Sequence, residues 1–334
     1  MDVLPELTLI KPATIAEAMA ARAAHPASRL LGGGTDLLVN LRRGIVAPPV
    51  LVDMTDVAEL REIHAGGERL IIGASVTLAA IAEHATLRAR YPVVAEAAQS
   101  IAGPTQREMG TLGGNLCLDT RCIYYNQSEW WRGANNHCLK TTGTVCHVAP
   151  KSRGVCFATF SGDLAPALMV LNAEVELLGP AGRRSLPLAE LYIGHARHDG
   201  GGGDGKKYLA LAPGEFVAGV RAPHVADLRS GYDKIRIRRS IEYPVAGVAV
   251  ALRRDGDTLA ELRVAFTGTN PRPVLLEGTE KLCGGPLEER VLAGLDDLVR
   301  DQIMAMKTTF TPGHYRRRVA GVLARRLLTR LFQR

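Results

Sequence analysis

From the 334-residue sequence we expect neither an export signal nor a membrane-spanning helix. No apolar run approaches the roughly 18 residues that a membrane-spanning helix needs. Residues 1–6 have neither a basic nor an apolar stretch, so no secretory signal is predicted. We therefore expect a cytoplasmic protein with reduced cysteines. This argues against structural disulfides and favours metal or redox chemistry for the six cysteines.

The sequence also lacks excess charge outside one short segment. The formal net charge is +7, but residues 316–334 contain seven arginines and no acidic residue. Removing them leaves 34 of the 41 basic residues against 34 acidic ones, which argues against nucleic-acid binding. Because Val319, Leu323, Leu327 and Leu331 recur there at helical spacing, we predict a final amphipathic helix with a solvated basic face. Contact with a partner subunit or an acidic ligand is the alternative.

The chain is long enough for two or three domains and shows no solenoid-type repeat. Alternating apolar runs and helical patterns predict strands at 7–10, 29–31, 50–52, 70–74, 234–237, 245–252 and 262–266. Helices are predicted at 12–25, with Thr14 as N-cap, at 77–91, at 93–102 and from about 286 onward. A glycine-rich loop is predicted at 199–205.

Two glycine-rich turns are candidate ligand-binding loops, at residues 32–36 (Gly-Gly-Gly-Thr-Asp) and 111–115 (Thr-Leu-Gly-Gly-Asn). Neither matches the GxGxxG dinucleotide fingerprint, and either one alone is most often just a tight turn. Each is predicted to end a strand, where backbone amides approach a ligand closely. Together they can converge on one pyrophosphate, with side-chain hydrogen bonds from Thr35, Thr111 and Asn115.

These loops, with residues 161–168 (Ser-Gly-Asp-Leu-Ala-Pro-Ala-Leu) and 232–236 (Tyr-Asp-Lys-Ile-Arg), resemble the FAD-binding subunits of xanthine-oxidase-type molybdenum hydroxylases. The resemblance covers nearly the whole chain. It implies an α+β protein with a two-subdomain FAD-binding fold of the vanillyl-alcohol oxidase (PCMH-like) type, followed by a C-terminal α+β domain. The implied bounds are 1–57 for the N-terminal FAD subdomain, 58–225 for the middle FAD subdomain and 226–334 for the C-terminal domain.

The resemblance also implies where FAD binds. The two loops hold the pyrophosphate and ribityl chain, Asp163 lies near the adenosine–ribityl part, and Lys234 lies near the flavin ring. The implied cofactor-binding residues are Leu30, Leu31, Gly32, Gly33, Gly34, Thr35, Asp36, Leu37, Thr111, Gly113, Gly114, Asn115, Asp163 and Lys234. From the residues alone, Asp163 can equally be a helix N-cap and Lys234 a solvated strand residue. No residue of this chain is expected to be catalytic.

Five of the six cysteines fall in one segment, residues 117–160, which we call the cysteine-rich insertion. Such clustering in a polar loop disfavours a set of inert buried thiols. From residue 122 the spacing is C-x15-C-x7-C-x9-C, without the CxxC pair usual in zinc sites and without the compact ferredoxin run. Four thiolates suit a [4Fe–4S] cluster, and zinc is the alternative. The candidate ligands are Cys122, Cys138, Cys146 and Cys156.

The remaining cysteines and the neighbouring histidines are expected to have other roles. Cys117 directly follows the second glycine loop and is expected to pack near FAD, whereas Cys283 is expected to be a core thiol. His137 and His147 each neighbour a ligand candidate and are expected to lie around the site without binding the metal.

The insertion narrows the resemblance. Residues 122–132, 138–140 and 146–148 resemble the β subunits of 4-hydroxybenzoyl-CoA reductases, which carry an additional [4Fe–4S] cluster. That resemblance implies a heterotrimer, itself dimerised, with a large molybdenum-cofactor subunit and a small subunit holding two [2Fe–2S] clusters. It also implies that a ferredoxin-like donor supplies electrons through [4Fe–4S] and FAD to the [2Fe–2S] clusters and molybdenum, where 4-hydroxybenzoyl-CoA is reduced to benzoyl-CoA.

Two other functions stay open at this stage. The first is an FAD subunit of an aldehyde, CO or xanthine-type molybdenum hydroxylase with a structural metal in the insertion. The second is a zinc-stabilised interaction module whose glycine loops are only turns.

Overall fold

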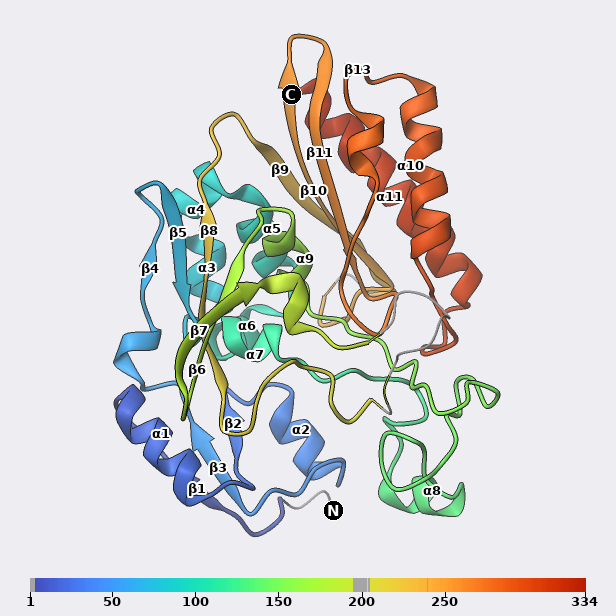
Figure 1. Ribbon diagram of the computed structural model, residues 1–334. Coiled ribbons are helices and arrows are strands. Elements are labelled where there is room, and N and C mark those ends of the chain that lie inside the picture. Colours follow the sequence, from blue (N-terminus) through green and yellow to red (C-terminus); the bar gives the residue numbers. More distant parts are fainter. Residues whose placement is uncertain (1–3, 195–202, 204, 239) are drawn as a thin grey trace.

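The computed structural model describes residues 4–194, 203, 205–238 and 240–334. Three sheets follow one another along the chain, and helices pack against each of them (Figure 1). Apart from Gly203 and Gly205, the glycine-rich loop predicted at 199–205 lies outside the described residues. The mixed helix-and-strand architecture confirms the predicted α+β fold class, while the domain bounds at 57 and 225 stay a prediction.

The N-terminal sheet is parallel and has the strand order β1-β3-β2, formed by Thr8–Ile10, Val50–Asp53 and Arg29–Leu31. Helices α1 (Ile15–Ala24) and α2 (Leu37–Arg42) connect the strands. The predicted N-cap is confirmed, since Thr14 Oγ1 accepts a hydrogen bond from the amide of Glu17 at 3.2 Å. The first glycine loop leaves the carboxyl end of β2, which is where open sheets place their ligands.

The middle sheet is antiparallel with the order β4-β5-β8-β6-β7. Its strands are Ile63–His64, Arg69–Gly73, Phe216–Pro223, Glu174–Gly179 and Gly182–Pro187. The helices around it are α3 (Leu78–Glu83), α4 (Ala85–Arg90), α5 (Pro92–Ser100), α6 (Pro104–Met109), α7 (Leu112–Leu116) and α9 (Leu164–Met169). The helix predicted over 77–91 is thus two helices, because His84 has extended backbone and caps α4.

The C-terminal sheet has the order β12-β11-β10-β9, with β13 beside β11. These strands are Val274–Leu275, Thr258–Thr267, Ala246–Asp255, Arg229–Ile235 and Gly285–Pro286. Strand β10 is apolar throughout its first half because both of its faces are covered. Val248 and Val250 pack against α10 (Glu289–Gln302) and α11 (Gly313–Gln333), whereas Ala249 and Ala251 face the middle part of the chain.

Three short 3-10 helices complete the regular structure, at Ala58–Leu60, Leu188–Leu191 and Thr279–Leu282. Among the described residues, no helix is both long enough and apolar enough to cross a bilayer. The predicted strand at 234–237 is β9, which begins earlier and ends at Ile235.

Helix α11 is the predicted C-terminal helix, but its basic residues are not all solvated. Arg316 is fully buried and donates hydrogen bonds to the carbonyl oxygens of Val245 and Met306, at 3.1 and 3.0 Å. It also donates to Thr308 Oγ1 at 2.7 Å and to the carbonyl oxygen of Gly268. The planar guanidinium has enough donors to satisfy several buried carbonyls at once. Arg316 therefore stabilises the packing of α11 on the sheet.

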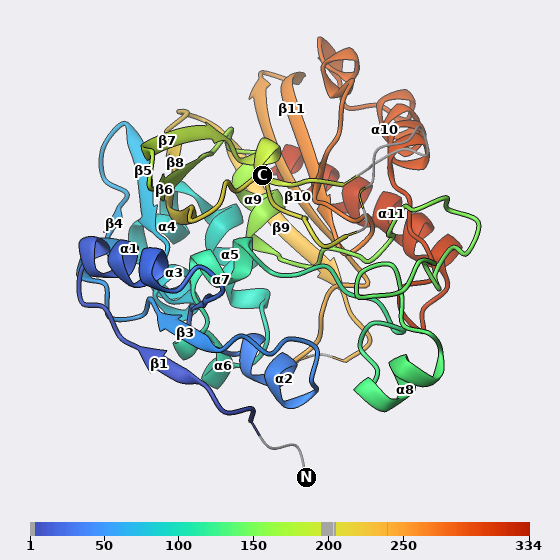
Figure 2. The same ribbon diagram turned by 60° about the horizontal axis from the view of Figure 1, so that its bottom comes forward.

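The cysteine-rich insertion contains one described helix, α8 (Glu129–Ala134), and otherwise irregular chain that lies apart from the three sheets (Figures 1 and 2). Figure 2 shows α8 on the same side of the molecule as α2. Hydrogen bonds fix the insertion to distant segments, including Arg121 Nη2 to Asn40 Oδ1 at 2.8 Å and the amide of Ile123 to the carbonyl of Thr308 at 2.9 Å.

Candidate functional site

A cleft of about 640 Å³ lies where the two glycine loops meet, and we call it the glycine-loop cleft. This volume falls in the range of about 300–1,000 Å³ that is usual for small-molecule and cofactor sites. Of the predicted cofactor-binding residues, the cleft is lined by Leu30, Gly32, Gly34, Thr35, Asp36, Leu37, Thr111, Gly114, Asn115 and Asp163. Leu31, Gly33, Gly113 and Lys234 are not in its lining.

The first glycine loop has the backbone conformation that a ligand-binding loop needs. Gly33 and Gly34 have φ of 85° and 74°, which residues with a side chain rarely adopt. A Cβ on Gly33 would lie 1.7 Å from the carbonyl oxygen of Met109, so the loop is pressed against the end of α6. The amides of Gly33, Gly34 and Thr35 donate no hydrogen bond to the residues that the structure describes. These amides are thus available to an anionic ligand.

The second glycine loop does not end a strand, contrary to the prediction. Thr111 is the N-cap of α7, and its Oγ1 accepts from the amide of Gly114 at 3.2 Å. The amide of Gly113 donates to the carbonyl of Ala74 at 2.8 Å, and that of Asn115 to Thr111. Because these amides already have protein acceptors, this loop offers a ligand few backbone donors. Its glycines instead permit close packing, since a Cβ on Gly113 would lie 3.0 Å from Ala74 Cβ.

The two loops are in direct contact. Thr111 Oγ1 lies 3.3 Å from the carbonyl oxygen of Gly32, to which it can donate. A Cβ on Gly32 would lie 2.7 Å from that hydroxyl, so only glycine fits. Asn115 Oδ1 accepts from the amide of Leu164 at 3.0 Å, which ties α7 to the start of α9. Thr111 and Asn115 therefore hold the wall of the cleft together through hydrogen bonds within the protein.

Asp163 and Lys234 form one buried unit beside the cleft. Lys234 Nζ lies 3.0 Å from Asp163 Oδ1, and their side chains are 3% and 4% exposed. Tyr232 donates its hydroxyl to the same oxygen at 2.5 Å. Burial lowers the pKa of Lys234, although the Asp163 carboxylate opposes that shift. Asp163 is the N-cap residue of α9 by position but makes no side-chain N-cap hydrogen bond, and Lys234 is not solvated.

The structure adds cleft residues that the sequence analysis did not single out. Tyr208 and Tyr243 line the cleft, and Tyr243 donates its hydroxyl to Asp36 Oδ1 at 3.2 Å. Asp119 and Glu215 also line it. Asp119 lies shortly after the second glycine loop, whereas the other three residues come from segments far from both loops, and no local motif marks any of them.

The four predicted cysteine ligands line one small cavity, which we call the cysteine cavity. Cys122, Cys138, Cys146 and Cys156 are each at most 8% exposed. The other lining residues are Tyr124, Tyr125, Leu139, Lys140, His147, Val148 and Ala158. The sequence prediction thus brought together four thiols that are up to 34 positions apart in the chain.

Each of these sulfurs has a hydrogen-bond donor. The amide of Tyr125 lies 3.4 Å from Cys122 Sγ, and that of Ala158 lies 3.5 Å from Cys156 Sγ. Thr141 Oγ1 lies 4.0 Å from Cys138 Sγ. A hydrogen bond with Cys156 and backbone amides lower the pKa of the Cys146 thiol, and the same hydrogen bond raises the pKa of Cys156. Burial raises the pKa of Cys122 to about 11. Donors around buried sulfurs stabilise thiolates and are a main determinant of iron–sulfur potentials.

The four thiols do not converge on a single point. Among the described residues, no three His, Cys, Asp or Glu side chains are arranged to hold one metal ion. A tetrahedral zinc site needs all four sulfurs at about 2.3 Å from one ion. In a four-iron cluster each iron takes its own cysteine, so the sulfurs stand further apart. The described thiols are therefore not arranged as a tetrahedral zinc site.

The remaining cysteines and histidines lie outside the set of four thiols. Cys117 lines the glycine-loop cleft, and burial raises its pKa to about 12. Cys283 packs with the core of the C-terminal sheet. His147 lines the cysteine cavity, with its Nε2 2.7 Å from the carbonyl oxygen of His137.

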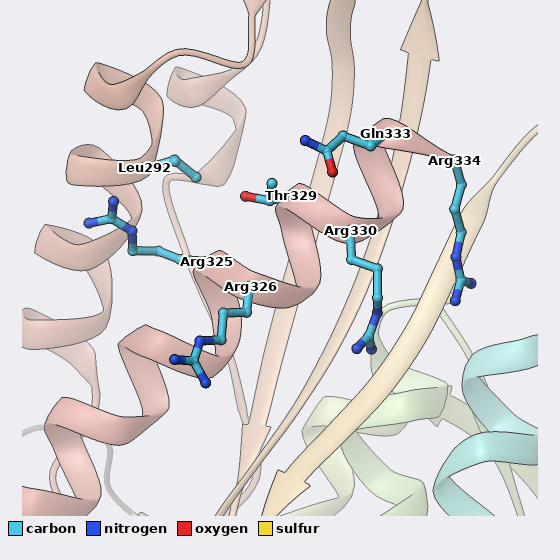
Figure 3. Close-up of a pocket in the computed structure, with 7 residues that line it drawn as sticks. All are labelled: Leu292, Arg325, Arg326, Thr329, Arg330, Gln333 and Arg334. Atoms are coloured by element: carbon cyan, nitrogen blue, oxygen red, sulfur yellow. The ribbon is translucent and has the colours of Figure 1, made fainter.

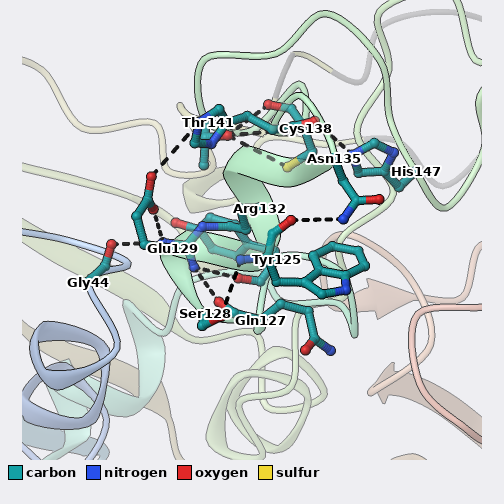
Figure 4. Close-up of polar contacts among 12 residues, drawn as sticks. Gly44, Tyr125, Gln127, Ser128, Glu129, Arg132, Asn135, Cys138, Thr141 and His147 are labelled. Atoms are coloured by element: carbon teal, nitrogen blue, oxygen red, sulfur yellow. Dashed lines mark hydrogen bonds and ion pairs between the residues drawn. The ribbon is translucent and has the colours of Figure 1, made fainter. Parts of the chain in front are cut away.

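Arg132 holds the insertion in place (Figure 4). Its side chain is 3% exposed and donates to the carbonyl oxygens of Gln127 at 2.5 Å and Gly44 at 2.8 Å. It also pairs with Glu129 at 2.5 Å. Gly44 follows α2, so this one side chain links the insertion to the segment behind the first glycine loop.

A shallow hollow on α11 is a second candidate surface (Figure 3). Its lining includes Arg325, Arg326, Arg330 and Arg334. Arg325 pairs with Asp296 and Glu289 of α10, both at 2.7 Å, and Arg330 lies 3.5 Å from Asp233. These carboxylates neutralise part of the basic face, which makes the hollow a weaker ligand site than the glycine-loop cleft.

Comparison with known proteins gives a consistent result. Residues 5–225 match the family described as FAD binding domain in molybdopterin dehydrogenase, and residues 231–331 match the CO dehydrogenase flavoprotein C-terminal domain. The aldehyde oxidoreductase FAD-binding subunit PaoB of Escherichia coli K12 is 30% identical, over 93% of this chain and 95% of that subunit. The carbon monoxide dehydrogenase medium chain of Afipia carboxidovorans is 27% identical, over 91% and 88%.

Solved structures agree on the fold. A chain of the reconstituted CO dehydrogenase from Oligotropha carboxidovorans superposes with a TM-score of 0.79 at 24% identity, covering 99% of both chains. A chain of quinoline 2-oxidoreductase from Pseudomonas putida 86 gives 0.77 at 21% identity, covering 99% of this chain and 98% of that one.

Proposed function

The chain belongs to the family of FAD-binding subunits of molybdenum hydroxylases, and on that premise we propose that it is an electron-transfer subunit with two redox sites. FAD occupies the glycine-loop cleft, and a [4Fe–4S] cluster occupies the cysteine cavity. The observation that carries the second site is the gathering of four buried, hydrogen-bonded cysteine thiols around one cavity.

For FAD, the residues of the cleft fit the cofactor's chemistry. The open amides of Gly33, Gly34 and Thr35 suit the oxygens of a pyrophosphate. The second loop supports the first through Thr111 and supplies the side chain of Asn115 to the cleft wall. Asp163 faces the cleft, and Lys234 acts on it from behind by fixing its carboxylate. FAD, when bound, exchanges one or two electrons, which suits a link between one-electron centres.

For the cluster, the cavity residues keep four thiolates dry and hydrogen-bonded. Tyr125 and Ala158 contribute backbone donors, and the Tyr125 ring excludes water. The four-cysteine lining, combined with a spacing that lacks the CxxC pair usual in zinc sites, is the reason to prefer a cluster over zinc.

The assembly we propose is a heterotrimer, present as a dimer. A large subunit holds the molybdenum cofactor and the substrate, and a small subunit holds [2Fe–2S] clusters. In the finer proposal, a low-potential donor of ferredoxin type supplies electrons, and 4-hydroxybenzoyl-CoA is reductively dehydroxylated on the large subunit. The four-cysteine insertion and its resemblance to the β subunits of such reductases support this direction.

A second candidate follows from the relatives. The names of these relatives refer to aldehydes and carbon monoxide. The relatives therefore support an oxidising molybdenum hydroxylase more directly than a reductase. In that case the metal in the insertion is structural. The isolated heterotrimer distinguishes the two functions. The reductive proposal requires benzoyl-CoA from 4-hydroxybenzoyl-CoA and a reduced low-potential donor. Turnover of aldehydes or carbon monoxide with an oxidant, and none of the thioester, supports the alternative.

The ligand set is tested by cysteine replacement in anaerobically purified protein. Cys138→Ser should lower iron content, whereas Cys117→Ser should leave iron unchanged because Cys117 lines the other site. Cys283→Ser is the matched control in the C-terminal core. Iron loss from Cys117→Ser with none from Cys138→Ser would overturn the assignment.

A further inference from the structure

Lys140 lies between the two proposed redox sites. It lines the cysteine cavity, yet its side chain is only 3% exposed and points to groups on the cleft side. Lys140 Nζ is 2.8 Å from Asp119 Oδ1 and donates to Thr120 Oγ1 at 2.8 Å. Since Asp119 lines the glycine-loop cleft, this ion pair joins the walls of the two sites.

Two tyrosine rings flank the same ammonium group. Lys140 Nζ lies 5.4 Å from the ring centroid of Tyr125, which lines the cysteine cavity. It lies 5.1 Å from the ring centroid of Tyr208, which lines the glycine-loop cleft. Both distances fall within the range of about 6 Å for cation–π attraction. The ammonium therefore has a fixed position between one ring from each site.

The charge of Lys140 is unusual for the cysteine cavity. Among the described residues that line this cavity, it is the only lysine or arginine. Four thiolates around a cluster carry negative charge, and a further electron adds to it. A cation in a buried, poorly screened position stabilises that added charge far more than a surface cation does.

We propose that Lys140 is a positioning residue that raises the reduction potential of the cluster in the cysteine cavity, with Asp119 on the cleft side opposing it. This inference rests on the proposed function, because it requires an iron–sulfur cluster at the four cysteines. The opposite charges of Lys140 and Asp119 together set the reduction potential of the cluster relative to that of the neighbouring flavin site.

The test measures the cluster midpoint potential by redox titration followed by electron paramagnetic resonance, in the intact anaerobic complex. Lys140→Met should shift the potential to more negative values, and Asp119→Asn should shift it to more positive values. We expect each shift to change the reduction equilibrium on the order of ten-fold, which is about 59 mV for one electron. Lys140→Arg keeps the charge and should restore most of the potential.

Lys151→Met is the matched control, since Lys151 is an exposed lysine of the same insertion and its loss removes the same charge. Its effect should be small because water and salt screen it.

Opposite shifts in the two test variants support the inference, because a purely structural role does not reverse sign. Shifts of the same sign, or none, overturn it. Loss of iron from both Lys140 variants also overturns it, because the side chain would then only hold the site together. If wild-type protein has flavin but no iron, the proposed function fails first, and the two failures are distinguishable.

Discussion

The ammonium nitrogen of Lys234 lies 3.0 Å from a carboxylate oxygen of Asp163, and neither side chain is more than 4% exposed. The pair joins β9 of the C-terminal sheet to the start of α9. A buried carboxylate that faces a cofactor cleft thus receives its counter-charge from a different sheet. The orientation of Asp163 toward the cleft depends on how these two parts of the chain pack.

Replacing Lys234 by Met should be strongly destabilising. The change leaves Asp163 charged and buried with only Tyr232 as a partner, and breaking such pairs costs about 3–5 kcal/mol. Urea unfolding of the FAD-loaded chain measures the difference. Arg183→Met is the control because it removes an exposed pair with Glu176, worth about 0–1 kcal/mol. Equal losses in the two variants would contradict the assigned role.

Glu215 should give the fold a pH-dependent contribution. Both of its carboxylate oxygens accept from Arg184 at 2.7 Å, and these hydrogen bonds hold the pKa of Glu215 below its ordinary value of 4.5. A carboxyl group whose pKa is lowered on folding stabilises the protein above its unfolded pKa and loses that contribution as pH falls through the folded pKa.

The difference in unfolding free energy between wild type and Glu215→Gln should therefore be constant at neutral pH and shrink below about pH 4.5. Denaturant titrations at a series of pH values check this. A difference that grows on acidification would contradict the prediction.

Replacing Gly33 by Ala should abolish flavin binding. The residue has φ of 85°, and the new Cβ would lie 1.7 Å from the carbonyl oxygen of Met109. A non-glycine residue at such φ costs on the order of 1–3 kcal/mol before any clash is counted. The first glycine loop, whose amides are available to the flavin, must therefore change its conformation. Flavin absorbance per chain is the readout, and Gly67→Ala, which has open space around it, is the control. Full flavin content in Gly33→Ala would refute the assigned cleft.

Replacing Arg132 by Met should loosen the cysteine-rich insertion without unfolding the rest. The change removes the donor of two partly buried hydrogen bonds, to the carbonyls of Gln127 and Gly44, at a cost of about 0.5–1.5 kcal/mol for each. Limited proteolysis should then cut within residues 117–160 faster than in wild type. Arg153→Met, at an exposed arginine of the same insertion, should have no such effect. Unchanged proteolysis in Arg132→Met would show that other contacts hold the insertion.

The features that could be predicted from the sequence are those that depend on local patterns of residues. The Thr14 cap and the strand at 245–252 follow from local side-chain type, and both are present, the strand as β10. The four cysteines were grouped by their clustering and spacing in one segment, and the structure places them around one cavity. Their role as metal ligands stays a prediction.

What the sequence did not predict depends on contacts between distant segments. The position of Lys140 between Tyr125 and Tyr208 joins residues more than 60 positions apart, and no motif signals it. The same holds for Arg316, a residue of a basic segment that turned out to be buried, because the carbonyls that accept from it come from three separate loops and strands. The second glycine loop was misplaced because its helix has only five residues and lacks a helical periodicity to read.

We propose that this FAD subunit carries a four-iron cluster held by Cys122, Cys138, Cys146 and Cys156. Mössbauer spectroscopy of anaerobically purified protein enriched in ⁵⁷Fe tests it most directly. We expect the isolated chain to give the spectrum of a [4Fe–4S] cluster with about four irons per chain, the full complement of one such cluster. A chain that contains flavin and zinc but no iron would contradict it.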